Sequence, residues 1–123
     1  MLNFVYDGKL RPGVIADQAN LLKFDQKEFF NNKPSSASMD DIGFVYIPTE
    51  CKDPTRLCKL HIALHGCQQG FYKIGDTYVQ HAGYLEVAEA NSIIVLFPQT
   101  LSTTGSNPNG CFDWWGWVQT IDH

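Results

Sequence analysis

The stretch Leu60–Gln69 has a residue order that suits acyl-transfer chemistry. An apolar run ends abruptly in His65-Gly66, polar residues follow, and a helical pattern begins soon after. This order is typical of a buried parallel strand that ends at the edge of a sheet and delivers a loop to a site. Backbone N–H groups of such a loop can hold the negative oxygen formed during ester hydrolysis, each worth about 3 kcal/mol. Cys67 would offer its N–H, and Gly66 would let the backbone turn without a Cβ clash.

The alternative is that His-Gly simply ends a buried strand. His65 stands on the loop itself, so we expect it to brace the loop by hydrogen bonding and not to act as a base. His61 lies mid-strand and is expected to be a core histidine, while His81 lies on a helix. His123 is the last residue, with no evident orienting partner for a base.

A nucleophile to accompany this loop is missing. A hydrolase serine needs a Gly-x-Ser-x-Gly turn between a strand and a helix, and no serine has that context. Ser106 follows Gly105, but Asn107-Pro108 places it in a loop. Cys67 precedes a helix and is the other candidate, although a disulfide is the favoured state for its thiol.

The four cysteines lie at 51, 58, 67 and 111. An even count indicates disulfides, and four cysteines allow about three connectivities. The alternatives are buried free thiols or a metal site. The cysteine spacings are wider than those of zinc ligands, so we expect no metal. Disulfides would indicate an oxidising compartment.

Three tryptophans, Trp114, Trp115 and Trp117, fall within four residues near the end of the sequence. Flat apolar rings with indole N–H groups suit an ester polymer chain or a sugar ring. The alternative is packing in the core beneath a long loop.

The elements that must position these residues follow from pattern. We expect strands over 20–25, 43–47, 57–64 and 92–98, and a helix from Asp76 or Thr77 to Ala90 that Asn91 ends. The first three strands suit a meander whose burial increases along the chain. The last is unbroken apolar sequence, typical of a strand covered on both faces. Residues 57–98 then form a βαβ unit, and the fold class is α/β with a right-handed crossover.

Composition limits the partners. The formal charge of −4 comes from scattered residues, so nothing suggests a nucleic-acid partner. No apolar run approaches the roughly 20 residues of a membrane span, and the first residues do not read as a signal peptide. We expect no cofactor.

Taken together, five segments resemble the polyhydroxybutyrate (PHB) depolymerase esterase family. They follow one another in one consistent order within residues 43–117, over half of the chain. The segments are Thr49–Cys58, Leu60–Gln69, Ile74–Tyr84, Ile94–Thr100 and Asn107–Trp117.

The resemblance implies a secreted serine esterase that cleaves 3-hydroxybutyrate esters. It implies a partial α/β-hydrolase fold, in which N-terminal antiparallel strands lead into the βαβ unit. Cys67 would match the oxyanion donor, and Trp117 and Trp114 the aromatic subsite. The cysteines would match two bridges, Cys51–Cys58 and Cys67–Cys111. The location implied is extracellular or periplasmic.

The family's catalytic triad is absent from this sequence, so we expect a fragment or split-gene product in one partial domain, 1–123. Residues 1–42 would form the connecting region and first strand, and 43–117 the oxyanion-loop and tryptophan region. Alone, the chain would be inactive, and a missing segment would carry the serine. The alternatives are a non-catalytic module that binds polyester or carbohydrate through its tryptophans, and a non-functional remnant.

Overall fold

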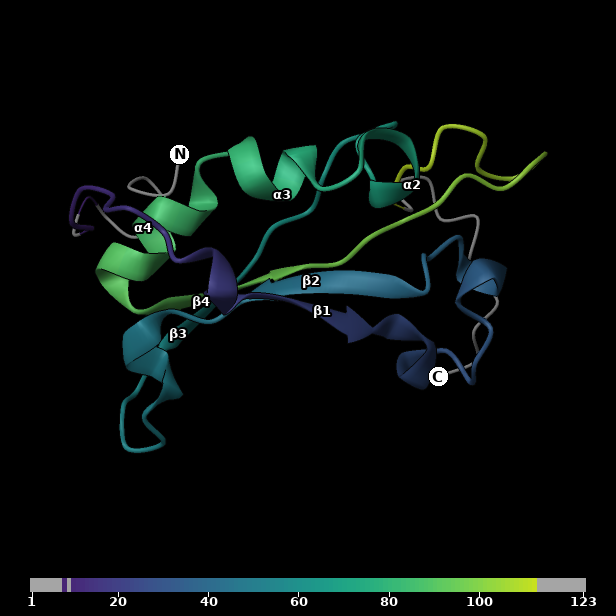
Figure 1. The fold of residues 1–123 in the computed structure, drawn as a ribbon. Coiled ribbons are helices and arrows are strands. Elements are labelled where there is room, and N and C mark those ends of the chain that lie inside the picture. The colour runs from purple at the N-terminus through teal and green to yellow at the C-terminus, as the bar shows by residue number, and fades with distance from the viewer. Residues whose placement is uncertain (1–7, 9, 113–123) are drawn as a thin grey trace.

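Four strands form one mixed sheet in the order β1-β2-β4-β3 (Figure 1). The structure is a computed structural model that describes Gly8 and residues 10–112. The strands are β1 (Leu21–Asp25), β2 (Ile42–Tyr46), β3 (Lys59–Ile62) and β4 (Ile93–Phe97). β2 pairs antiparallel with β1 and with β4, whereas β3 pairs parallel with β4. The α/β class and the partial α/β-hydrolase arrangement are therefore confirmed.

Three short helices lie along one face of the sheet (Figure 1). They are α2 (Phe71–Ile74), α3 (Thr77–His81) and α4 (Tyr84–Asn91). The expectation of a single helix from Asp76 or Thr77 to Ala90 is wrong, because the helical segment is interrupted between α3 and α4. Gly83 takes a φ of +85°, a left-handed conformation that ends α3 and lets α4 start in a new direction.

Single turns of 3-10 helix lie before β1 and in the connections that lead from β1 to β3. They are η1 (Gln18–Asn20), η2 (Gln26–Phe29), η3 (Pro34–Ala37) and η4 (Thr49–Lys52). Aspartates begin the first two, since Asp17 accepts from the Ala19 N–H and Asp25 from the Lys27 N–H. An aspartate side chain at this position satisfies a backbone donor that has no partner within the turn.

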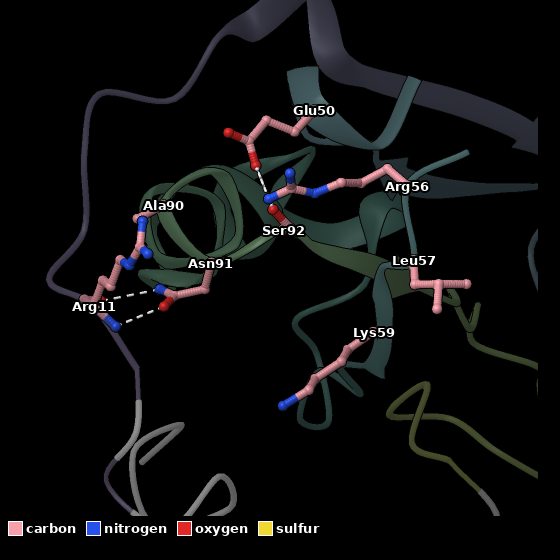
Figure 2. A pocket seen from close by; sticks show the side chains of 8 residues that line it. All are labelled: Arg11, Glu50, Arg56, Leu57, Lys59, Ala90, Asn91 and Ser92. Carbon is pink, nitrogen blue, oxygen red and sulfur yellow. Dashed lines mark hydrogen bonds and ion pairs between the residues drawn. The ribbon is translucent and has the colours of Figure 1, made fainter. Parts of the chain in front are cut away.

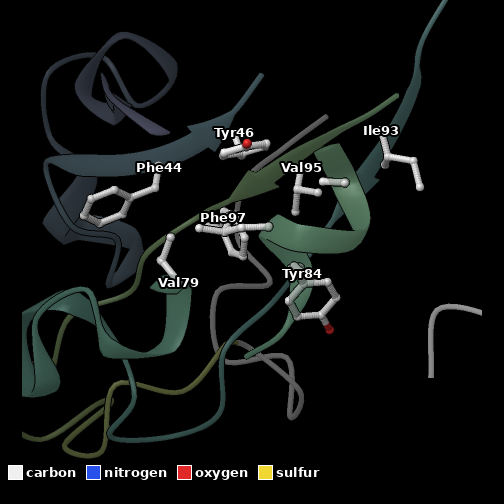
Figure 3. Close-up of a cluster of buried hydrophobic side chains, with 10 residues drawn as sticks. Phe44, Tyr46, Val79, Tyr84, Ile93, Val95 and Phe97 are labelled. Carbon is white, nitrogen blue, oxygen red and sulfur yellow. The ribbon is translucent and has the colours of Figure 1, made fainter. Parts of the chain in front are cut away.

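The core lies between the sheet and its helices (Figure 3). Phe44 and Tyr46 of β2 and Val95 and Phe97 of β4 point toward the helices and are almost fully buried. From the helix side, Val79, Tyr84, Leu85 and Ala88 complete the cluster. The Tyr84 ring packs edge-on against Phe97 with centroids 5.9 Å apart. Burying side chains of this size stabilises the fold by about 1.5–3 kcal/mol each.

The opposite face of the sheet is not covered in the part of the chain that the structure describes. Leu60 and Ile62 of β3 are 61% and 54% exposed, and Ile94 and Leu96 beside them are only half-buried. The expectation that the strand at 92–98 is covered on both faces is therefore wrong here, since its burial alternates residue by residue.

The expectation that the first three strands form a meander is also wrong. β4 lies between β2 and β3, so the strand that precedes the His-Gly loop is at the edge of the sheet and not toward its centre. β3 is shorter than the expected 57–64, and burial does not increase along the three strands. No helix among the described residues is long and apolar enough to cross a membrane.

Candidate oxyanion loop

The loop after β3 is a tight turn from Gly66 to Gln69. The Gln69 N–H donates to the Gly66 carbonyl at 3.2 Å, which closes the turn. Gln68 has a φ of +60°, and a type II turn requires a positive φ at its third position. The Gly66 N–H donates to Gln69 Oε1 at 2.8 Å, so one side chain fixes both ends of the turn.

Cys67 occupies the second position of this turn and is exposed. Its backbone N–H donates to no other residue of the described chain, whereas the N–H groups of Gly66, Gln68 and Gln69 are all bonded. Backbone donors without a partner are uncommon in folded proteins unless water or a ligand can reach them. Within the described residues, Cys67 therefore presents a donor without a protein acceptor, in the loop that follows β3.

A second segment holds the turn from the side. The Gln68 N–H donates to the Asn109 carbonyl at 2.8 Å, and the Gln68 and Asn109 side chains bond at 3.0 Å. The Tyr72 hydroxyl donates to the same carbonyl at 3.0 Å. Gly110 has a φ of +56° and lies against the Tyr72 ring, which leaves no room for a Cβ. The turn is thus packed on a rigid neighbour.

A disulfide joins the same two segments. Cys67 is bonded to Cys111, with Cα atoms 4.3 Å apart, and Cys51 is bonded to Cys58. These are the two pairings that the family resemblance implied, and there are no free cysteines. Asn107 secures the partner, because its buried side-chain amide bonds both the N–H and the carbonyl of Cys111 at 3.0 and 2.8 Å.

His65 anchors the loop from beneath. Its side chain is buried, and Nε2 accepts the Thr100 N–H at 3.1 Å. Because Nε2 accepts, Nδ1 carries the proton and donates to the Gly66 carbonyl at 2.7 Å. Burial lowers the pKa of His65, and the bond to Gly66 raises it in part. With its pKa lowered, His65 is neutral at pH 7, and it bonds both Gly66 of the loop and Thr100 after β4.

Tyr78 adds a further contact from α3. Its hydroxyl donates to the Leu64 carbonyl at 3.1 Å, and its ring meets His65 edge-on at 6.1 Å. Burial and the nearby Tyr84 raise the pKa of Tyr78 to about 12. The hydroxyl therefore keeps its proton and remains a donor at neutral pH.

Two buried glutamines, Gln26 and Gln99, position the segments next to the loop, and the sequence patterns predicted neither contact. Gln99 accepts the Phe71 N–H at 2.9 Å, which fixes the start of α2 directly after the loop. The backbone of Gln99 exchanges two bonds of 3.0 Å with the Gln26 side chain. Periodicity favours apolar residues inside, so it gives no signal for a buried amide pair. The only sequence signal was that Gln99 directly follows the strand-ending Pro98.

No described serine is placed as a nucleophile beside a histidine base, and the Thr100 hydroxyl, 3.3 Å from His65 Nε2, donates to the Gly110 carbonyl instead. The Ser92 hydroxyl donates to Glu50 at 2.7 Å, and Ser106 bonds Thr103 at 3.1 Å. Neither serine hydroxyl contacts a histidine. Cys67 is in a disulfide, so its thiol is not available for attack.

A separate cavity of about 280 Å³ lies at the other end of the sheet, where β3 and β4 begin (Figure 2). Its lining includes Arg56, which pairs with Glu50 at 2.6 Å, and Arg11, whose N–H donates to the Asn91 side chain at 2.6 Å. Because it opens at the start of the strands, it is distant from the Cys67 donor at their end.

Trp114 and Trp117 lie outside the described residues. Across the described part of the chain, no three His, Cys, Asp or Glu side chains gather where they could hold a metal ion.

The chain is similar to curated polyester-degrading enzymes. It is 40% identical to a polyhydroxybutyrate depolymerase of Talaromyces funiculosus over 89 aligned residues, covering 64% of this chain and 26% of the relative. It is also 40% identical to a poly(3-hydroxybutyrate) depolymerase of Delftia acidovorans over 99 residues, covering 80% of this chain and 19% of that one. The chain thus spans about a quarter or less of these relatives' length. No protein-family model matches it.

Two solved structures share the fold. One is a PHB depolymerase with a serine-to-alanine substitution, complexed with an R3HB trimer. It has a TM-score of 0.81 and 34% identity, over 94% of this chain and 38% of that one. The other is the PHB depolymerase from Penicillium funiculosum, with a TM-score of 0.77 and 34% identity, over 92% of this chain and 37% of that one.

Proposed function

We propose that over its matched part the chain belongs to the polyhydroxybutyrate depolymerase family, to whose members it is similar, and that it forms the oxyanion-hole and substrate-binding portion of a polyester esterase. The observation that carries this proposal is the open Cys67 N–H. It lies on an exposed turn at the carboxyl end of β3, held by a disulfide on one side and by His65 beneath. Fixed donors of this kind stabilise developing negative charge because they need not reorganise during the reaction.

In this proposal the reaction is hydrolysis of a 3-hydroxybutyrate ester, in a polymer or in a short-chain ester. A serine attacks the ester carbonyl, and the Cys67 N–H holds the oxygen that becomes negative. The serine belongs to a segment outside the sequence described here, since no serine of this sequence lies in a Gly-x-Ser-x-Gly turn. Trp114 and Trp117 form the aromatic subsite, by their match to the family. Both curated relatives are named as depolymerases of polyhydroxybutyrate, which supports a 3-hydroxybutyrate ester as the substrate class.

The proposed location is outside the cytoplasm. Two disulfides in 123 residues support an oxidising compartment.

The chain alone should be catalytically inactive. A fluorophosphonate probe, which labels activated serines, is expected to leave the purified chain unlabelled. Covalent labelling of the isolated chain would contradict the proposed division of the active site.

The donor role is tested on the chain assembled with the remainder of the Talaromyces funiculosus depolymerase, co-expressed as a second polypeptide. Cys67→Pro removes the N–H, and proline suits the second position of a type II turn. Cys67→Ala keeps the N–H. Both variants also carry Cys111→Ala, so neither has the disulfide. They differ in whether residue 67 has a backbone N–H. We expect kcat for p-nitrophenyl butyrate to be about 100-fold to 1,000-fold lower in the proline variant than in the alanine variant. Equal kcat values would exclude Cys67 as an oxyanion donor.

A further inference from the structure

The cavity at the start of β3 and β4 has a positively charged lining (Figure 2). Arg11, Arg56 and Lys59 contribute to it from two segments of the chain, and Glu50 is the one carboxylate among the described residues that line it. Three of the nine Lys and Arg residues thus surround one concave site, on a chain whose formal charge is −4. A concave site lined by one sign of charge raises the local concentration of ions of the opposite sign. The cavity therefore favours an anion.

Glu50 is already bonded within the lining. Its Oε2 atom accepts from Arg56 Nη2 at 2.6 Å and from the Ser92 hydroxyl at 2.7 Å. These two bonds balance the charge of Arg56 and join η4 to the start of β4. Because Arg56 is paired with the chain's own carboxylate, an incoming anion needs another guanidinium.

Arg11 provides that guanidinium. Its backbone is fixed to the end of α4, since its N–H donates to Asn91 Oδ1 at 2.6 Å and its carbonyl accepts from Asn91 Nδ2 at 3.0 Å. Asn91 is itself held in place, because Nδ2 also donates to the Val87 carbonyl at 2.8 Å. The Arg11 guanidinium, in contrast, bonds to no described residue. A guanidinium presents two parallel N–H groups that match the two oxygens of a carboxylate.

The size and lining of the cavity favour a small carboxylate. The volume of about 280 Å³ lies just below the range of about 300–1,000 Å³ that is typical of sites for drug-sized ligands. Glu50 repels each additional negative charge of a bound anion, which disfavours phosphate relative to a monovalent carboxylate. The Leu57 side chain lines the cavity and is 96% exposed, so it offers an apolar contact to a short carbon chain.

Resting on the proposed function, we propose that this cavity binds short-chain carboxylates such as 3-hydroxybutyrate, the product class of that reaction. Hydrolysis of an ester adds water, so the acyl side leaves with a carboxylate and the other side with a hydroxyl. Arg11 holds the carboxylate through its paired N–H groups, Lys59 adds a positive charge, and Leu57 contacts the carbon chain. The cavity opens at the start of the strands, so product bound here leaves the Cys67 donor at their other end unoccupied.

The test titrates sodium 3-hydroxybutyrate into the full 123-residue chain and follows the backbone amides of Asn91 and Ser92 by NMR. Methyl 3-hydroxybutyrate is the matched ligand without a charge, and inorganic phosphate is the competing anion. We expect saturable shifts with the acid. Its Kd should be at least about tenfold lower than that of the ester or of phosphate, because only the acid is a monovalent anion that Arg11 can hold through two bonds.

Substitutions of Arg11 test the residue that carries the proposal. Arg11→Gln removes the guanidinium and keeps the backbone bonds to Asn91, so the Kd for the acid should rise at least about tenfold. Arg11→Lys keeps the charge without the paired N–H groups and should give an intermediate Kd. The matched control is Lys33→Gln, which removes a positive charge from an exposed residue outside the cavity. It should leave the Kd unchanged.

Equal affinity for the acid and its methyl ester would overturn the carboxylate site, as would phosphate binding as tight as that of the acid. Equal loss of affinity from Arg11→Gln and Lys33→Gln, or the absence of saturable shifts, would overturn it too.

The carboxylate site and the proposed function fail separately. Both are measured on the chain assembled with the remainder of the Talaromyces funiculosus depolymerase. Binding that Arg11→Gln weakens, in an assembly that hydrolyses no ester, would support the carboxylate site and count against the function. Ester hydrolysis without binding at the cavity would overturn the carboxylate site and leave the function standing.

Discussion

His65 holds one proton in a position that its neighbours determine. The Thr100 N–H needs an acceptor at Nε2, and the Gly66 carbonyl needs a donor at Nδ1. A protonated imidazolium would have donors on both nitrogens, so Nε2 would face the Thr100 N–H donor to donor. The ring also lies 4.9 Å from the Phe112 ring, in surroundings that solvate a charge poorly. The loop's lower anchor therefore depends on a neutral histidine.

This dependence predicts a loss of stability in acid. The pKa of His65 is lowered in the folded chain, so the unfolded chain binds more protons at pH values between that pKa and about 6.5. The free energy of unfolding should therefore fall as the pH falls through this interval. Gln has an acceptor and a donor but no charge to gain. We expect His65→Gln to lose less stability than the parent chain between about pH 7.5 and about pH 5.5, measured by urea denaturation at each pH.

His61 provides the control. Burial lowers its pKa too, but it lies mid-strand and its ring packs against Tyr84 at 5.6 Å, away from the Gly66 and Thr100 bonds. His61→Gln should keep the share of the pH dependence that comes from His65. If His65→Gln shows the full pH dependence of the parent chain, His65 is not the residue that titrates.

At the scale of elements, sequence patterns located most strands and failed where tertiary context decides. β1, β2 and β4 lie within about one residue of expectation, and for β2 and β4 the reason is that β-branched and aromatic runs bounded by turn residues are strong signals. The break at Gly83 was missed because its flanking residues continue an apolar helical spacing. The position of β4 between β2 and β3 depends on long-range pairing, which no local pattern encodes. The loop that contains Cys67 lies between β3 and a helix, as the pattern predicts, whereas its contacts with buried glutamines had no signal in the residue periodicity.

Gly83 allows a direct test of the helix break. Its φ of +85° is strained for any residue with a Cβ, although no atom lies within 4 Å of the Cβ position. The cost of Gly83→Ala should therefore be conformational, about 1–2 kcal/mol of unfolding free energy by chemical denaturation. Gly83→Asn should cost less, since asparagine tolerates this conformation better. A neutral or stabilising alanine would mean that α3 and α4 can join into one helix.

At the scale of the whole molecule, the two disulfides close loops of very different size. Cys51–Cys58 spans 7 residues and Cys67–Cys111 spans 44. The longer bridge links the turn after β3 to the segment that follows β4, so it joins both ends of the α/β unit. The shorter bridge only fixes the connection before β3.

Removing the bridges should therefore have unequal effects. On the chain-entropy model the Cys67–Cys111 bridge contributes about 4 kcal/mol and Cys51–Cys58 about 2.5 kcal/mol. We expect the Cys67→Ala, Cys111→Ala chain to unfold at a lower temperature than the Cys51→Ala, Cys58→Ala chain, measured by circular dichroism. The reverse order would show that the shorter bridge stabilises the native state by more than loop closure.

The anchoring of the turn also bears on how fast an assembly could form. Every described contact that fixes Gly66 to Gln69 comes from this chain itself, through His65, Asn109 and Cys111. The entropy of ordering the donor is therefore lost during folding and not during association. Association with the segment that carries the serine would be a rigid-body encounter. Its on-rate would lie in the usual range of about 10⁵–10⁷ M⁻¹s⁻¹, because no loop has to rearrange.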